Sequence, residues 1–575
     1  MVAATVQTRR LTTQRLEIAD ETTVIRSLDW DRDRFDIEFG LQNGTTYNSY
    51  IIRGEKIALV DTSHEKFRQL YLDVLAQTID PATIDYLIVS HTEPDHSGLV
   101  ADILQLAPHA TVVGAKIAIQ FLEDLVHRPF ERIVVKHDDT LDLGNGHQLA
   151  FLMAPNLHWP DTIFTHDAKT GLLFTCDAFG AHYCTDDVFD TNVDTLMPDF
   201  RFYYECLMAP NARSVLAAMK RMDALASPIT TIATGHGPLL RYHVPDLTQH
   251  YREWSQAKAK AETMVAVFYV SDYGYSDRLS QAIARGITKT EVAVEMMDLK
   301  SADPQEVGEL VGRAQGLVIC TPPSSGTVAT MAKAALGTLL AAVKNKQVVG
   351  LFEAYGGDDE PIDPLLSQFR DLALTIGFEP IRVKETPTDV TYQLCEEAGT
   401  DLGQLLIRDR KIKSQKAIDN DLEKALGRIS GGLYIITAQK GEVKGAMLAS
   451  WVSQASFEPL GFTVAVAKDR AIESLMQVGD RFVLNILEEG KHLGLMKHFL
   501  KRFPPGADRF AGVNTQTASN GSPILIDALA YTECEVVRRM ECSDHWLVYS
   551  QVTAGRVSNP EGMTAVHHRK VGNYY

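Results

Sequence analysis

The sequence predicts a multidomain α/β protein, and three patterns support this prediction. At 575 residues the chain is long enough for three or four domains of ordinary size. Between residues 263 and 400, apolar strands alternate with helix-length segments, which is typical of a doubly wound parallel sheet. After residue 424, short strands alternate with turns, which is typical of an antiparallel barrel. The predicted domains are residues 1–260, 261–405 and 424–575, with a linker at 406–423.

Composition excludes several classes of protein. The hydrophobic content of 45% and charged content of 23% are those of a soluble globular protein. No apolar run approaches the ~20 residues that span a membrane, and residues 1–13 lack a signal-peptide core, so we expect a cytoplasmic protein with no membrane span. A net charge of -18 argues against nucleic acid as a partner. The seven cysteines are scattered and form no C-x-x-C, which argues against disulfides, structural zinc and iron–sulfur clusters.

Metal-competent side chains crowd into one hexapeptide, His91-Thr92-Glu93-Pro94-Asp95-His96. It follows an apolar run at residues 86–89 that predicts a buried strand, and a loop there leads toward a helix. Imidazoles and carboxylates packed this closely repel one another or lose solvation unless a divalent cation satisfies them. The hexapeptide therefore predicts a metal site, with a solvated, helix-capping loop as the alternative.

Three more candidate ligands lie further along the chain, each just after a predicted strand: His158, Asp177 and His236. Side chains at strand ends gather at one edge of stacked sheets. Alone, each would be interpreted as a structural histidine or a turn aspartate. Together with the hexapeptide they make seven candidate ligands, enough for two metal ions.

The order and spacing of these seven residues resemble those of the metallo-β-lactamase fold, an αββα sandwich. Zinc hydrolases of that fold have His where this chain has Glu93. Flavodiiron proteins have Glu there, and the chain resembles this family. Two ferrous ions would be balanced by three carboxylates and a bridging hydroxide, and an oxygen-rich ligand set favours iron over zinc. The resemblance implies that one iron takes His91, Glu93 and His158, that the other takes Asp95, His96 and His236, and that Asp177 bridges them.

The second domain offers three loops after predicted strands at residues 264–269, 316–320 and 348–352. Ligands of doubly wound folds bind at these strand ends. The first loop can cradle a phosphate and resembles the flavodoxin phosphate loop, although Tyr273 stands where Ser or Thr is common. The resemblance implies FMN, with Tyr355 beside the ring or in ordinary turn packing. The candidate contacts are Ser271, Asp272, Tyr273, Gly274, Tyr275, Ser276, Thr321, Pro322, Ser324, Ser325, Gly326, Tyr355, Gly356 and Gly357.

The third domain resembles the split-barrel flavin reductases through residues 445–453, Phe457-Glu458-Pro459 and residues 482–487. The resemblance implies a bound FMN or FAD, with Ser450, Ser453 and Asn485 as candidate contacts and ordinary strand and turn hydrogen bonding as the alternative. No G-x-G-x-x-G occurs, so a nicotinamide would stack on the flavin. The terminal His567-His568-Arg569-Lys570 is interpreted as a solvated tail rather than as a phosphate-steering segment.

The resemblance covers the whole chain and is to the three-module flavodiiron proteins of oxygenic phototrophs. It implies an NAD(P)H:oxygen oxidoreductase that reduces O2 to water at a di-iron site fed by flavins, as an electron sink protecting photosynthetic electron transport. NADPH, NADH and reduced ferredoxin remain possible donors. It also implies a head-to-tail homodimer or a hetero-oligomer with a paralogue. The alternatives are nitric oxide reduction, a subunit active only in a hetero-oligomer and, disfavoured by Glu93 and the flavin modules, a zinc hydrolase.

Overall fold

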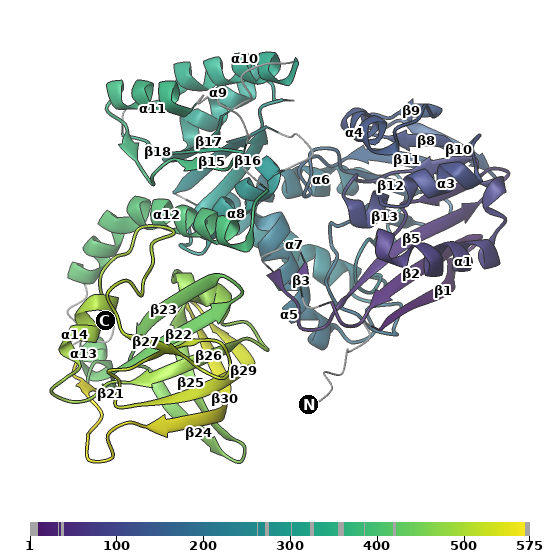
Figure 1. Cartoon of the computed structure of the whole chain (residues 1–575). Coiled ribbons are helices and arrows are strands. Elements are labelled where there is room, and N and C mark those ends of the chain that lie inside the picture. Colours follow the sequence, from purple (N-terminus) through teal and green to yellow (C-terminus); the bar gives the residue numbers. More distant parts are fainter. Residues whose placement is uncertain are drawn as a thin grey trace. The chain divides into compact units, whose positions relative to one another are not determined.

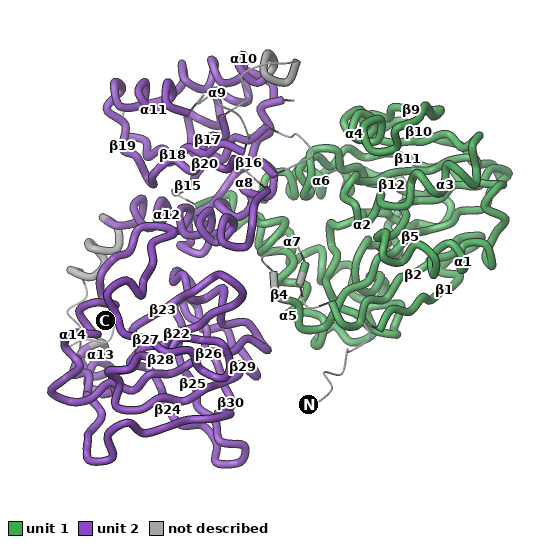
Figure 2. The backbone as a smooth tube through the Cα atoms, in the orientation of Figure 1, with its two compact units in different colours: residues 1–262 green, residues 263–575 purple. Residues whose placement is uncertain are grey.

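The computed structural model describes residues 10–32, 34–35, 39–261, 263–270, 275–300, 302–321, 327–344, 346–354, 362–384, 386–417 and 421–569 (Figure 1). The chain divides into two units, residues 1–262 and 263–575 (Figure 2). No helix in these described ranges is both long enough and apolar enough to cross a bilayer.

The first unit contains two sheets packed face to face. One runs in the order β1 (Leu11–Ala19), β2 (Thr22–Asp29), β5 (Thr45–Arg53), β6 (Ile57–Val60), β7 (Tyr86–Ile88), β8 (Thr111–Gly114) and β9 (Arg132–Val134). The other runs in the order β10 (Thr140–Gly144), β11 (His147–Met153), β12 (Ile163–Asp167), β13 (Leu172–Cys176) and β14 (Thr231–Thr234). A short β3–β4 ladder (Arg34–Phe35 and Phe39–Gly40) lies outside both sheets. Val24, Tyr50, Phe151 and Phe174 from the two sheets share one buried core, as in a sandwich.

Helices cover the two outer faces of this sandwich. The first sheet packs against α1 (Arg68–Thr78), α3 (Val100–Leu106) and α4 (Lys116–Val126). The second packs against α5 (Val193–Tyr203), α6 (Ala212–Asp223) and α7 (Val244–Ala259). Each helix contributes apolar residues at a helical spacing, which makes it amphipathic and drives its packing. The predicted αββα arrangement is confirmed.

The second unit begins with a parallel sheet in the order β16 (Ala293–Asp298), β15 (Met264–Tyr269), β17 (Gly316–Cys320), β18 (Val348–Glu353) and β19 (Thr375–Ile376), with β20 (Ile381–Arg382) also paired to β18. The connecting helices are α8 (Tyr275–Thr288), α9 (Pro304–Arg313), α10 (Thr327–Ala342), α11 (Ile362–Asp371) and α12 (Asp389–Ala417). Strands β15, β17 and β18 are buried along their whole length, as strands covered on both faces must be. The flavodoxin-like prediction is confirmed.

The rest of the second unit is an antiparallel sheet. Its order is β23 (Val443–Ala449), β22 (Tyr434–Lys440), β26 (Arg481–Ile486), β29 (Ala530–Cys542), β30 (His545–Val557), β25 (Leu460–Ala467) and β24 (Val452–Phe457). Around it lie the β21–β31 pair (Gly431–Gly432 and Val566–His567), the β27–β28 pair (Thr515–Thr517 and Pro523–Leu525), α13 (Asp421–Leu426) and α14 (Leu493–Phe499). The edge strands β23 and β24 are consecutive in the chain, so the sheet is open between them.

Two predicted segments differ from the structure. The strand predicted at 446–453 is divided at Ser450-Trp451, where the chain leaves β23 and enters β24. The uninterrupted apolar pattern hid this break, because the next strand continues with similar residues. The linker predicted at 406–423 begins inside α12, which runs from Asp389 to Ala417 without interruption. The boundary at residue 424 stays a prediction.

Candidate metal centre

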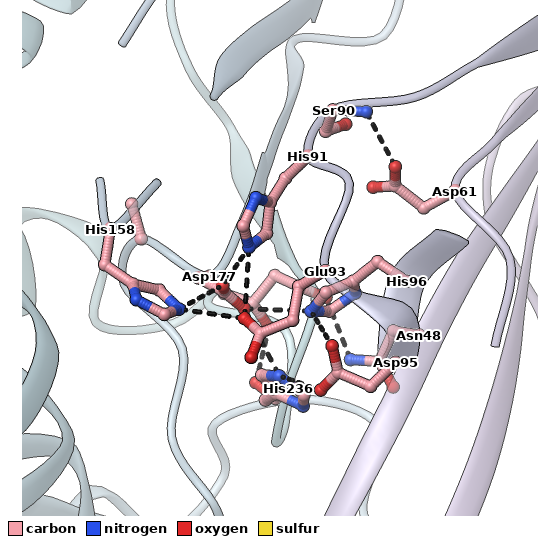
Figure 3. Close-up of polar contacts among 12 residues, drawn as sticks. Asn48, Asp61, Ser90, His91, Glu93, Asp95, His96, His158, Asp177 and His236 are labelled. Atoms are coloured by element: carbon pink, nitrogen blue, oxygen red, sulfur yellow. Dashed lines mark hydrogen bonds and ion pairs between the residues drawn. The ribbon is translucent and has the colours of Figure 1, made fainter. Parts of the chain in front are cut away.

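The hexapeptide lies at the end of β7, and its second half is helical. Pro94 is the first residue of α2 (Pro94–Ser97), so Asp95 and His96 belong to a short helix rather than to the predicted loop. A proline at the first helical position has no N–H to leave unpaired, which explains why the helix begins there. Asp61, directly after β6, accepts a hydrogen bond from the Ser90 backbone N–H (2.7 Å) and so ties down the residue before His91 (Figure 3).

The carboxylate of Asp177 stands between two pairs of histidines (Figure 3). Its Oδ2 lies 3.2 Å from His91 Nε2 and 3.3 Å from His158 Nε2. Its Oδ1 lies 3.0 Å from His96 Nε2 and 3.2 Å from His236 Nε2. Each oxygen therefore faces one pair, which is the geometry of a carboxylate that bridges two ions.

Glu93 and Asp95 complete the two groups. Glu93 Oε2 lies 3.2 Å from His91 Nε2 and 2.9 Å from His158 Nε2. Asp95 lies 3.5 Å from His96 Nε2 through Oδ1 and 3.3 Å from His236 Nε2 through Oδ2. The candidate ligand atoms cluster within 4.8 Å of one another in two sets, His91, Glu93, His158 and Asp177 in the first and Asp95, His96 and His236 in the second. All seven predicted ligands are thus brought together, and in the grouping that the resemblance implies.

These separations fit bound ions better than they fit hydrogen bonds alone. Metal–ligand bonds of about 2.1 Å at right angles place adjacent ligand atoms about 3 Å apart. Among the described residues, Asp95 Oδ1 and Asp177 Oδ2 are buried without a hydrogen-bond partner. Buried carboxylates without such partners are costly unless a cation neutralises them. The seven residues, which we call the metal-site cluster, therefore fit a pair of divalent ions.

The electrostatics of the cluster describe its metal-free protonation. Burial opposes charging of the histidines, but Glu93 raises the pKa of His158 to about 10 and Asp177 and Asp95 raise that of His236 to about 10. Burial and Asp95 oppose ionisation of Glu93, but His158 and His91 lower its pKa to about 2. Near neutral pH the metal-free cluster thus holds protons on imidazoles that an incoming ion must displace.

Three polar residues that the sequence analysis missed orient the histidines. Asp161 Oδ1 lies 3.3 Å from His91 Nδ1, and its Oδ2 accepts hydrogen bonds from the Thr92 backbone N–H (3.0 Å) and hydroxyl (2.5 Å). The carbonyl oxygen of Thr46 lies 2.6 Å from His236 Nδ1. Asn48 donates to the Thr234 and Gly237 carbonyls, at 2.9 and 3.0 Å, and so holds the His236 loop. Partners of this kind turn Nε2 toward a metal. Asp161 follows His158 by three residues, but its role depends on a contact 70 residues away.

Two further missed residues lie behind His236. The His182 ring is 4.6 Å from that of His236 and 4.9 Å from that of Tyr203. His182 Nδ1 lies 2.8 Å from Thr45 Oγ1. Burial lowers the pKa of His182 well below its usual range, so its imidazole is neutral. The pocket behind the second histidine group is therefore aromatic and uncharged on this side.

The predicted flavin contacts of the second domain fall mostly outside the described residues, namely Ser271, Asp272, Tyr273, Gly274, Pro322, Ser324, Ser325, Gly326, Tyr355, Gly356 and Gly357. Ser276 is buried, and its hydroxyl donates to the Val270 carbonyl, which closes the first loop. Thr321 ends β17 with a buried hydroxyl that has no hydrogen-bond partner among the described residues. Tyr275 is partly exposed and donates to Thr386. These three remain flavin-contact predictions.

The three candidates in the barrel differ from one another. Ser450 is buried at the β23–β24 break, and its Oγ finds no hydrogen-bond partner within the described part of the chain. Ser453 is exposed on β24. The buried Asn485 donates to Ile435 O and Thr437 Oγ1 (both 3.0 Å) and accepts from Leu525 N (2.8 Å). These bonds use the amide within the barrel, so the geometry favours the structural alternative for Asn485.

The C-terminal tail is not simply solvated. His567 belongs to β31, which pairs with β21. The Arg569 guanidinium lies 4.9 Å from the centre of the Trp451 ring. Backbone pairing and this cation–π contact hold the segment against the β23–β24 break. The solvated-tail interpretation is wrong for these two residues; Lys570 lies outside the described residues.

Known proteins share both the modules and the whole chain. Residues 45–237 match the ODP family beta lactamase model, and residues 426–574 match the flavin reductase like domain model. The chain is 70% identical over 567 residues to diflavin flavoprotein A 1 of Synechocystis sp. PCC 6803, covering 99% of this chain and 98% of that protein. It is 68% identical to putative diflavin flavoprotein A 3 of Nostoc sp. PCC 7120, with both chains covered completely.

A solved structure extends the similarity to the first two modules. The metal-soaked Flv1 flavodiiron core from Synechocystis sp. PCC 6803 is 40% identical, with a TM-score of 0.65, and the match covers 69% of this chain and 99% of that one. The sandwich, its buried His and carboxylate cluster and the two appended flavin-type modules define a flavodiiron oxidoreductase. More particularly, the chain belongs to the cyanobacterial diflavin flavoprotein A family, flavodiiron proteins that end in a flavin reductase domain.

Proposed function

We propose that this protein is an NAD(P)H:oxygen oxidoreductase that reduces O2 to water. The balanced reaction consumes one O2, two NAD(P)H and two protons and forms two water molecules and two NAD(P)+. The observation that carries the proposal is the division of the two Asp177 oxygens between two histidine pairs, each completed by one further carboxylate. A diatomic oxidant that accepts four electrons suits a site built for two adjacent ions.

In this proposal the metal-site cluster holds two irons, which would supply electrons and Lewis acidity to the bound oxidant. The chain's own residues perform the positioning. Asp161 and the Thr46 carbonyl orient His91 and His236, so that the Nε2 atoms of both face the same point. The seven ligands are at most 8% exposed, apart from the partly buried Asp95. A site this closed limits escape of partly reduced oxygen.

The electron supply follows the order of the modules. We propose that the C-terminal barrel accepts hydride from NADPH or NADH on a bound FMN or FAD, and that the flavodoxin-like domain carries the electrons on FMN. The buried hydroxyls of Ser450 and Thr321, without hydrogen-bond partners among the described residues, support ligand contacts in both modules. Reduced ferredoxin as the donor, the role as an electron sink and the head-to-tail or hetero-oligomeric assembly rest on the family resemblance.

The first experiment is metal and flavin analysis of protein purified from iron-supplied cells. We expect about two irons per chain together with flavin. O2 and NAD(P)H consumption by this material should then occur in a ratio of one to two without peroxide release. Zinc, or an absence of metal, would contradict the proposal. Faster turnover of nitric oxide than of O2 would assign the alternative oxidant, and turnover only after a paralogue is added would assign a hetero-oligomeric subunit.

A further inference from the structure

One face of α12 carries polar side chains that contact the barrel rather than water. The residues are spaced three or four apart, which places them on a single side of a helix. Gln393 lies 2.9 Å from Ser474 Oγ and 3.4 Å from Ala471 O. Further along the same side, Glu397, Asp401 and Gln404 contact the barrel residues Gly506, Arg509, Arg502 and Asp469 at 3.0 to 3.2 Å.

A cluster of charges lies at one end of this contact and joins four elements. Lys289, directly after α8, places its Nζ 2.5 Å from Glu396 Oε1 on α12 and 2.6 Å from Glu473 Oε2 in the barrel. Arg539 on β29 lies 2.5 Å from the other oxygen of Glu473. Arg285 on α8 lies 3.5 Å from Glu396. We call these five residues the interdomain cluster, and Lys289 is the member that bridges a carboxylate of each domain.

The interdomain cluster is buried. Glu396 and Glu473 are 3% and 4% exposed, and the Lys289 side chain is 11% exposed. Burial by itself would raise the pKa of Glu473, but Lys289, Arg539 and Arg285 hold that pKa well below its usual range. Buried ion pairs are screened little by salt, and removing one partner leaves an uncompensated charge in the interior. A transient contact between tethered domains would instead keep its charges exposed and exchangeable with water.

We propose that this face of α12 is a permanent docking surface for the reductase barrel of the same chain, with Lys289 as the residue that joins the two domains. The barrel therefore does not swing on a flexible linker. The helical continuity of α12 from Asp389 to Ala417, across the predicted start of that linker, is consistent with this arrangement. A consequence, which rests on the proposed function, is that electrons pass between the two flavin modules within one chain.

Hydrogen exchange of the full-length protein tests the docking without requiring flavin or iron. The Gly506 N–H donates to Glu397, so undocking exposes it directly. In Lys289→Met we expect exchange at residues 471–475 and at Gly506 to accelerate by more than about 30-fold, because a buried carboxylate loses its counter-ion. Lys289→Arg should restore most of the protection. Amides of β15 and β26 serve as the internal check that both domains stay folded.

The matched control is Lys491→Met, which removes an exposed lysine paired with Glu488 at 2.9 Å inside the barrel. It should change exchange at residues 471–475 by less than about twofold. Equal effects of the two variants, or exchange at Gly506 in the unmodified protein as fast as in an open loop, would overturn the docking proposal.

Electron transfer between the flavins tests the consequence separately. In holoprotein, the rate of reduction of the second flavin should be independent of protein concentration and should fall in Lys289→Met but not in Lys491→Met. A rate that rises with protein concentration would overturn transfer within one chain. A protein that binds no flavin would defeat the proposed function, whereas the exchange result would still decide the docking.

Discussion

The metal-site cluster and the interdomain cluster both bury charged side chains. In the metal-site cluster, Glu93, Asp95 and Asp177 face four imidazoles, which carry positive charge only when protonated. In the interdomain cluster, Glu396 and Glu473 face Lys289, Arg285 and Arg539, which are cations at all physiological pH values. The first set of carboxylates therefore depends on protons or metal ions for its counter-charge, and the second carries its own.

This difference separates a site built for chemistry from one built for assembly. Histidine can exchange a proton for a metal ion near neutral pH, whereas lysine and arginine cannot. Asp95 and Asp177 keep carboxylate oxygens without hydrogen-bond partners among the described residues, as expected where ions should bind. Glu473 instead has a cation within 2.6 Å of each of its oxygens. Four predictions test this contrast, from the largest expected effect to the smallest.

Replacing the bridging carboxylate should have the largest effect. Asp177→Ala removes the residue whose two oxygens serve both ligand groups, so we expect loss of both metal ions and at least a ~1000-fold drop in oxidase turnover. Iron content by elemental analysis and O2 consumption measure this. The control is Asp73→Ala, which removes an exposed carboxylate on α1 and should leave both unchanged. Retention of two irons in Asp177→Ala would refute the bridging role.

Metal removal should destabilise the first unit and leave the second unaffected. A ligand present at about 1000 times its Kd stabilises the folded state by ~4 kcal/mol, and a chelator removes that contribution. We expect calorimetry to show that the transition of residues 1–262 moves to lower temperature, whereas that of residues 263–575 stays. A chelator-induced shift of the second transition would show that the interdomain cluster also depends on a metal.

The metal-free first unit should lose stability as pH rises. His158 and His236 have folded-state pKa values raised to about 10 from an ordinary 6.5, so their contribution is fully present below pH 6.5 and lost as pH approaches 10. We expect a loss of about 3 kcal/mol across this window, measured by urea unfolding in chelator. Below pH 4.5 stability should fall as well, because the pKa of Glu93 is lowered to about 2. Iron affinity should rise with pH over the first window, since binding displaces these protons. A flat profile between pH 6.5 and 10 would contradict the assigned protonation.

The smallest effect should come from the positioning carboxylate. Asp161→Asn keeps the side-chain size but removes the charge beside His91 Nδ1, so we expect iron affinity to fall by about 10- to 100-fold with little change in the fold. Competition with a coloured chelator measures the affinity. Because Asp161 supports only the first ligand group, one iron should leave before the other. Equal weakening of both would show that Asp161 acts on the whole site rather than on His91.

Much of this protein is readable from local sequence. Apolar runs predict the strands, and the bounds of β5, β13, β15 and β17 agree with the predicted segments because a buried strand needs consecutive apolar residues wherever it lies. The seven metal-site residues could be selected because each is the first polar, ligand-capable residue after such a run or part of the hexapeptide. Both signals depend on residues close together in the chain.

The tertiary structure alone decided three other features. The division of the Asp177 oxygens between two groups and the contact of Asp161 with His91 join residues 70 or more positions apart. The break at Ser450-Trp451 depends on where the barrel opens, since the residues on both sides of it favour strands equally. The polar face of α12 looks like a solvent-exposed helix face in sequence, and only the barrel packed against it turns those charges into an interface. A local pattern determines which residues are polar, and long-range packing determines whether water, an ion or another domain satisfies them.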